Sequence, residues 1–230
     1  MAGLWSSNAH RWVYETFKIL HRDISVDNIM WFVRDGRIGP ATSPWRLKTW
    51  VNTEQKPTTA PSQLTPMQIP RYRTGLFMAM DLLRSGRPPV HKYRHDLESF
   101  FYVYAYATAA YNPVTKTFGH IAQWQRGSLV DVGKCKHEFF TRRKELLDVF
   151  SEMHPLFEPL LQPGTFFVRL LTLFAILERH RDKVDEVTWG YLEDTLDAGV
   201  AAQVEEIERE RDQMVTYSTF MEILGEPEDV

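Results

Sequence analysis

The sequence predicts a mainly helical domain that carries one small β-hairpin near its N-terminus. Three observations support this fold class. Apolar residues recur at helical spacing over several stretches, and residues 97–111 are apolar or aromatic on nearly every face. The dipeptide Asp35-Gly36, a common hairpin turn, separates two short apolar runs. At 230 residues the chain is long enough to bury a core, and we expect a single domain over 1–230.

The elements are expected in the following order. Residues 8–20 place their large apolar side chains on one helical face, and residues 29–33 and 37–41 pair as the strands of the hairpin. A helix that is apolar all round, such as 97–111, belongs at the centre of a domain, and Asp96 stands before it as a possible N-cap. Further helices are expected over 134–152, 165–181, 185–196 and 199–214. The last of them carries charges at most positions, so it and the tail to residue 230 are expected on the surface.

Residues 52–70 differ from the rest of the chain in composition. This segment contains four prolines and four threonines, and large apolar residues are almost absent from it. Such a segment cannot bury enough surface to offset the entropy lost on ordering, so a flexible loop is expected.

Composition and charge exclude several classes of function. The net charge of −3 offers no general attraction to nucleic acid or to an anionic membrane. Cys135 is the only cysteine, so an intrachain disulfide is impossible and an intracellular, reducing compartment is expected. The most apolar stretch, 166–177, is too short to span a bilayer and contains Arg169, so no membrane association is expected.

The most informative motif lies in residues 21–30, whose sequence is HRDISVDNIM. It fits the pattern H-R-D-x-x-x-x-N of a catalytic loop for phosphoryl transfer. In such a loop the aspartate takes a proton from the acceptor hydroxyl and the asparagine binds a metal ion. The sequence contains no glycine-rich phosphate loop.

Three strings in the first half of the chain resemble the larger, C-terminal lobe of the fungal-type protein kinases. They are LHRDISVDNIMW at 20–31, RTGLFMAMDLL at 73–83 and HDLESFFYVYA at 95–105. The resemblance implies a protein-kinase-like fold, with the small hairpin after the catalytic loop and residues 52–70 in the place of the activation segment. Only 20 residues precede His21, so the smaller, N-terminal lobe is expected to be absent.

The resemblance also assigns roles to five residues. Asp23 would be the catalytic base, and Asn28 would bind one of the Mg²⁺ ions that bridge the phosphates of ATP. His21 and Arg22 would complete the catalytic motif as scaffold, with Arg22 able to meet a phosphate or carboxylate of the activation segment. Asp96 would accept hydrogen bonds from the backbone of the catalytic loop and so connect it to the central helix.

One part of the family pattern is replaced in this chain. The family carries an Asp-(Phe/Trp)-Asp-Leu-Ala string after the hairpin, and this sequence has Ser-Pro-Trp-Arg-Leu over 43–47. Pro44 replaces the metal-binding aspartate and Arg46 replaces the second one. Without that carboxylate and the smaller lobe, weak or absent binding and turnover of ATP is expected for this chain alone.

Three hypotheses about function remain open. The first is a protein kinase by descent, which transfers the γ-phosphate of ATP to serine or threonine of a protein substrate. The second is a pseudokinase fragment that binds a partner protein. The third is a small-molecule phosphotransferase of kinase-like fold, against which the string at 95–105 argues. His91 and His95 have the i, i+4 spacing of a helical metal pair, but no third ligand is evident.

Overall fold

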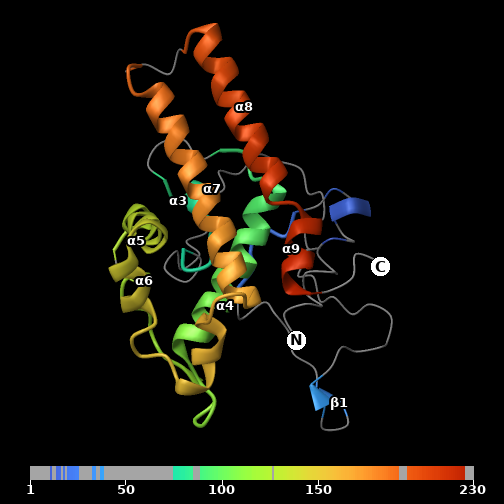
Figure 1. The fold of residues 1–230 in the computed structure, drawn as a ribbon, viewed down its shortest axis with the longest axis vertical. Coiled ribbons are helices and arrows are strands. Elements are labelled where there is room, and N and C mark those ends of the chain that lie inside the picture. The colour runs from blue at the N-terminus through green and yellow to red at the C-terminus, as the bar shows by residue number, and fades with distance from the viewer. Residues whose placement is uncertain are drawn as a thin grey trace, which may run out of the picture.

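The computed structural model describes residues 11, 14–16, 18, 20–25, 33–34, 37–38, 75–84, 89–125, 127–191 and 196–225. Over these residues the protein is mainly helical, as predicted, with two short antiparallel hairpins (Figure 1). The predicted segment 52–70, together with Asn28, Pro44 and Arg46, lies outside the described residues. The absence of a smaller lobe stays a prediction. The elements are β1 (Val33–Arg34), β2 (Arg37–Ile38), α3 (Met80–Leu83), α4 (Tyr93–Ala110), β3 (Tyr111–Asn112), β4 (Thr117–Phe118), α5 (Leu129–Thr141), α6 (Arg143–Val149), the 3₁₀ helix η1 (Pro155–Leu161), α7 (Phe166–Thr188), α8 (Ala198–Met214) and α9 (Tyr217–Leu224).

The predicted hairpin is confirmed, because β1 pairs with β2 in antiparallel register, with Val33 opposite Ile38 and Arg34 opposite Arg37. A second hairpin, β3–β4, follows α4 directly and was not predicted. Asn112 starts its turn, where the side-chain oxygen accepts the backbone N–H groups of Val114 and Thr115. Pro113 comes directly after Asn112, so the dipeptide Asn112-Pro113 is a turn signal that the sequence analysis did not use.

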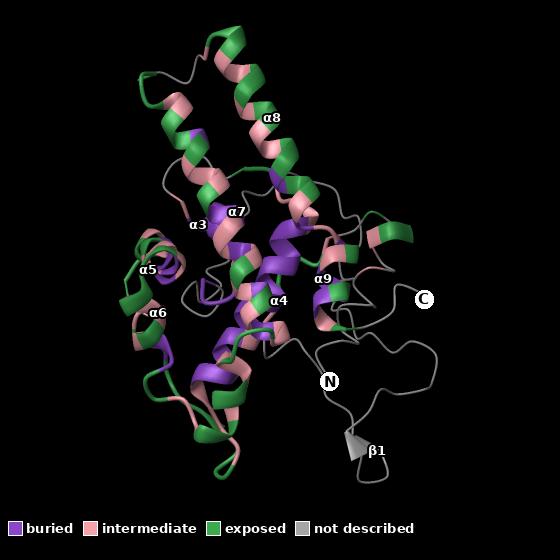
Figure 2. Ribbon diagram, viewed as in Figure 1, coloured by how far each residue is buried: buried purple, intermediate pink, exposed green. Residues whose placement is uncertain are grey.

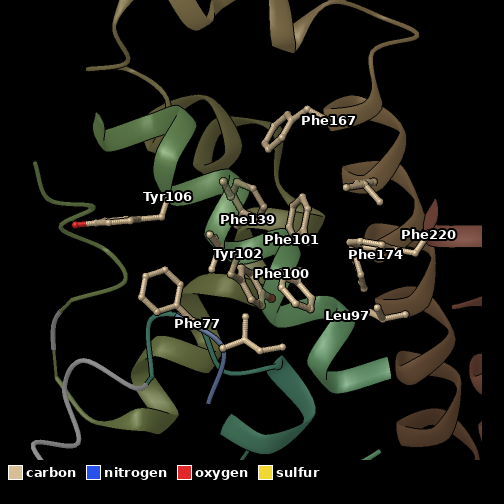
Figure 3. Packing of buried hydrophobic residues seen from close by; sticks show 14 of the residues in the cluster. Phe77, Leu97, Phe100, Phe101, Tyr102, Tyr106, Phe139, Phe167, Phe174 and Phe220 are labelled. Carbon is tan, nitrogen blue, oxygen red and sulfur yellow. The ribbon is translucent and has the colours of Figure 1, made fainter. Parts of the chain in front are cut away.

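The central helix α4 is buried over most of its circumference, as its composition predicts, and only one face of it is half-buried (Figure 2). Its aromatic side chains meet side chains from α5 and α7 in one hydrophobic cluster (Figure 3). Phe101 lies at the centre, with ring centroids 5.1 Å from Phe174 and 5.9 Å from Phe167. Aromatic pairs at such separations contribute about 0.5–1.5 kcal/mol each beyond the area that they bury. The cluster therefore fixes the position of α4, which carries the candidate site.

Two helical boundaries differ from the prediction. The expected helix over 134–152 is two helices, α5 and α6, which meet at Arg142 in an extended conformation. The expected helix over 165–181 continues to Thr188 as α7, which contains no glycine or proline and so takes in the start of the helix expected over 185–196. The next residues, 189–191, are not helical. The N-termini of α5, α7 and α8 each have a side-chain cap, from Ser128, Thr165 and Asp197 respectively.

Helices α7 and α8 lie side by side and extend from the rest of the molecule as a long helical pair (Figure 1). Their far ends are largely exposed, whereas their other ends pack on α4 and α9 (Figure 2). Among the described helices, none is by itself long and apolar enough to cross a membrane. Taken together, η1 and α7 have the length and apolar composition of a membrane-spanning segment, but they are bent by 56° relative to each other.

Candidate functional site

Residues 20–25 form an irregular loop with a polar, exposed tip made of His21, Arg22 and Asp23. The next side chain, Ile24, is buried in the hydrophobic core and anchors the loop to the domain. Within the tip, the backbone N–H of Asp23 donates to Nδ1 of His21 at 3.3 Å. The Asp23 carboxylate therefore lies at the surface, and the next residue, Ile24, is fixed in the core.

Asp96 holds this loop from the first turn of α4. Its carboxylate accepts the backbone N–H of His21 on Oδ2 at 2.8 Å and the backbone N–H of Arg22 on Oδ1 at 3.2 Å. Asp96 is 1% exposed, so these hydrogen bonds form away from most of the solvent. These are contacts of the kind that the resemblance implies for Asp96.

The prediction that Asp96 stands before the central helix is wrong, because α4 begins at Tyr93 with Lys92 as its N-cap. The backbone N–H of Lys92 donates to Nδ1 of His95 at 3.0 Å, so the side chain at the third helical position gives the N-cap N–H its hydrogen-bond acceptor. The Asp96 carboxylate is therefore available to the loop rather than to its own helix.

The loop backbone is strained at Arg22, whose φ of 63° lies in the left-handed region. A residue with a side chain adopts this conformation at a cost of about 1–2 kcal/mol. Hydrogen bonds to a charged acceptor contribute about 1.5–3 kcal/mol each, so the two bonds to Asp96 are sufficient to stabilise it. The conformation of the loop thus depends on a residue more than 70 positions away in the sequence.

His91 and His95 do not form a metal pair. Nε2 of His91 lies 2.8 Å from Oδ1 of Asp96, and Nε2 of His95 lies 3.4 Å from Asp81. Each ring therefore faces a different carboxylate, and His91 lies before the helix rather than on it. Burial lowers the pKa of His95.

A buried lysine and a buried glutamate fix the segment 75–80, which precedes and begins α3. Nζ of Lys136, which is fully buried, donates to the backbone carbonyls of Gly75 at 3.1 Å and Met78 at 2.6 Å. The Glu98 carboxylate accepts the backbone N–H of Met80 at 2.9 Å. Together they pair three backbone groups that would otherwise be buried without partners.

Burial shifts the pKa of both Glu98 and Lys136. Burial, with a smaller effect from the negative charge of Asp81, raises the pKa of Glu98 to about 7. Burial lowers the pKa of Lys136 well below its ordinary value. Because the folded-state pKa of Glu98 exceeds its ordinary value, its contribution to stability is complete below pH 4.5 and is lost as pH rises through about 7.

Asp81, in α3, is the centre of a buried ionic network. Its carboxylate lies 2.6 Å from Nη1 of Arg94 in α4 and 3.0 Å from Nη2 of Arg211 in α8. Burial alone would raise the pKa of Asp81, but the nearby His95 ring and the charges of Arg211 and Arg94 hold the pKa of this carboxyl far below its usual range. Glu208 also contacts both arginines, at 2.9 Å from Arg94 and 2.6 Å from Arg211.

Through this network a helix from the end of the chain stabilises the segment near the loop. Arg211 is only 2% exposed although most of α8 is half-buried or exposed. The charge pattern of α8 gave no sign that one arginine is buried, since neighbouring Arg209 is exposed.

The burial of Glu98, in contrast, could have been predicted from the sequence. Glu98 is the one acidic residue within 97–111, a segment otherwise suited to a buried helix.

A mainly helical domain in which a buried carboxylate of the central helix holds an HRD loop is the arrangement expected of a protein-kinase-like domain. Comparison with protein families agrees with this. A family model described as fungal protein kinase matches residues 7–108, which confirms the resemblance over 102 of the 230 residues. A search among curated proteins and a search among solved structures each found no match.

Kinase-like domains generally use ATP with Mg²⁺, and the side chains available for the metal fit it poorly. Asn28 offers a neutral amide oxygen, and Pro44 offers no side-chain oxygen where the family has a carboxylate. Mg²⁺ in such sites is held by one or two carboxylates together with the phosphates.

Proposed function

We propose that this chain contributes the larger lobe of a protein-kinase-like domain, in which Asp23 is the residue placed for a catalytic base. The proposal concerns transfer of the γ-phosphate of ATP to serine or threonine of a protein substrate. The observation that carries it is the pair of hydrogen bonds from the His21 and Arg22 backbone to Asp96. A strained residue that is held by a buried carboxylate motivates the hypothesis that this loop has a function in catalysis or recognition.

The geometry of the tip supports the role of Asp23. A general base must come within hydrogen-bond reach of the hydroxyl that it deprotonates, and the exposed Asp23 carboxylate is accessible from solvent. Its position is set on one side by Ile24 in the core and on the other by the bonds to Asp96. Such preorganisation reduces the entropy that must be lost when a substrate hydroxyl is oriented for reaction.

The chain by itself is expected to be catalytically incomplete. The replacement by Pro44 removes the carboxylate that would hold the metal ion, and Arg46 has no acceptor oxygen to offer instead. We therefore derive no reaction step through the nucleotide in this chain.

The same replacements favour a second candidate, a pseudokinase module that binds a partner protein. In this case the exposed tip of the loop, residues 21–23, serves as a recognition surface, and the hydrogen bonds to the buried Asp96 keep it in place. The two candidates differ in whether the chain needs Mg²⁺ and ATP.

One experiment separates them. Thermal unfolding of the purified chain is measured with ATP, with and without Mg²⁺, and transfer of labelled phosphate to a mixed peptide substrate is measured in parallel. A Mg²⁺-dependent stabilisation with transfer that is lost in Asp23→Asn, but kept in the exposed control Asp131→Asn, supports the enzyme. Equal transfer by Asp23→Asn would remove the role assigned to that residue. No stabilisation and no transfer would favour the binding module.

A further inference from the structure

A second group of ligand-type side chains, none of them used in the candidate site, lies between α5 and α7. It consists of His137 on α5 and of Glu178 and Asp182 on α7. The two carboxylates have i, i+4 spacing, which places them on the same face of the helix. One donor atom from each of the three residues lies within 4.8 Å of the other two.

The environment of this trio is negative and partly buried. Glu178 is only 2% exposed, and its Oε1 lies 2.7 Å from Nδ1 of His137 and also contacts Arg84. Asp182 is half-buried and its carboxylate lies within 4.8 Å of these donor atoms. A buried carboxylate is costly unless it is compensated, and here a single arginine and a histidine proton offset two acids.

A divalent cation would compensate this charge more completely. Two carboxylates and one imidazole are a ligand set of zinc sites, whereas Mg²⁺ and Ca²⁺ prefer oxygen alone. With bonds of about 2.0–2.1 Å, ligand atoms around tetrahedral zinc lie about 3.3 Å apart. The donors therefore need to approach by roughly 1.5 Å at most, which is within reach of side-chain rotation at the half-buried Asp182.

Access from solvent comes through an open depression of about 350 Å³ lined by Asp182, Asp185, Glu186 and Trp189. The depression adjoins Asp182 of the trio, and its open side leaves room for water as a fourth ligand. The group thus has protein ligands on two helices, an approach path and a vacant coordination direction.

We propose that His137, Glu178 and Asp182 form a binding site for a divalent metal ion of the zinc type. Binding replaces the proton on Nδ1 of His137, and the ion shares Glu178 with the guanidinium of Arg84. The ion connects α5 to α7 directly. Because Arg84 directly follows α3, the site also adjoins the segment that Lys136 and Glu98 hold. This inference is independent of whether the domain transfers phosphate.

The test uses the whole chain after treatment with a chelator. Zinc chloride is titrated while heat release and the midpoint of thermal unfolding are measured, and Co²⁺ is used as a spectroscopic substitute that reports coordination geometry. We expect 1:1 binding with a rise in the midpoint. His137→Ala and Asp182→Asn should each weaken binding at least tenfold, since even outer-shell partners of a metal contribute about 10–100-fold.

Two matched controls identify a false result. Glu186→Gln removes an acid from the same depression but not from the trio, and His120→Ala removes an exposed histidine elsewhere. Both should bind zinc as the unchanged chain does. The proposal is overturned if the unchanged chain does not bind zinc, or if the four variants lose affinity equally. If His137→Ala unfolds, Asp182→Asn on the half-buried side of the site decides the question by the same measurement.

Discussion

Replacement of Asp96 by alanine tests how far the candidate loop depends on the central helix. The substitution removes the acceptor for two backbone N–H groups, those of His21 and Arg22. Two hydrogen bonds to a charged group contribute roughly 3–6 kcal/mol in total. The freed N–H groups regain hydration because the loop tip is exposed, so we take the lower end, about 3 kcal/mol. That exceeds the strain of about 1–2 kcal/mol at the left-handed Arg22, so the loop should leave its conformation once the carboxylate is gone.

Amide hydrogen exchange, measured residue by residue, is the direct assay. A loss of about 3 kcal/mol corresponds to roughly a 100-fold faster exchange at His21 and Arg22, since each 1.4 kcal/mol is a factor of ten. Amides in the middle of α7 report global stability and correct for any general destabilisation. Asp197→Ala, which removes the cap of α8 and has no contact with the loop, is the matched control. Unchanged exchange at His21 and Arg22 in Asp96→Ala would refute the argument.

Three further predictions concern buried groups. Arg211→Met should lower the free energy of unfolding by about 1.5–3 kcal/mol in urea titration, because the buried Asp81 carboxylate loses one of its two arginine partners and keeps only Arg94. Arg209→Met, at an exposed position of the same helix, should change it by less than about 0.5 kcal/mol; equal effects would contradict the network. Glu98→Gln should remove the part of the stability loss that occurs between pH 4.5 and about 7, measured by thermal unfolding across that range; an unchanged pH profile would count against this assignment. Gly133→Ala should destabilise the chain despite the better helix propensity of alanine, because a Cβ there would lie 3.1 Å from Leu83. Gly190→Ala, where a Cβ meets nothing within 4 Å, is its control, and a stabilised Gly133→Ala variant would show that α3 and α5 can separate at little cost.

The functional questions about this chain centre on two kinds of residue. In the proposed function Asp23 is the catalytic base, and the expectation against activity rests on Pro44, which stands where the family pattern has a metal-binding aspartate. The hydrogen bonds to Asp96 hold the loop whether or not a nucleotide binds. They are compatible with catalysis and with recognition, so only the nucleotide and transfer measurements distinguish the two.

The sequence by itself determined the helical class, the first hairpin and the family resemblance. Each depends on local information: apolar periodicity, an Asp-Gly turn and short motifs such as His21-Arg22-Asp23. Local patterns also identified Asp96 as a candidate, although they placed it before its helix rather than within it.

Only the tertiary structure decided which charges are buried and with which partners. Arg211 and Asp81 are 130 positions apart, and Lys136 reaches carbonyls of residues about 60 positions earlier. No periodicity distinguishes Arg211 from exposed Arg209, because the burial of a charge depends on what other helices bring against it. The same holds for His137, Glu178 and Asp182, which become a single ligand group only when α5 packs on α7.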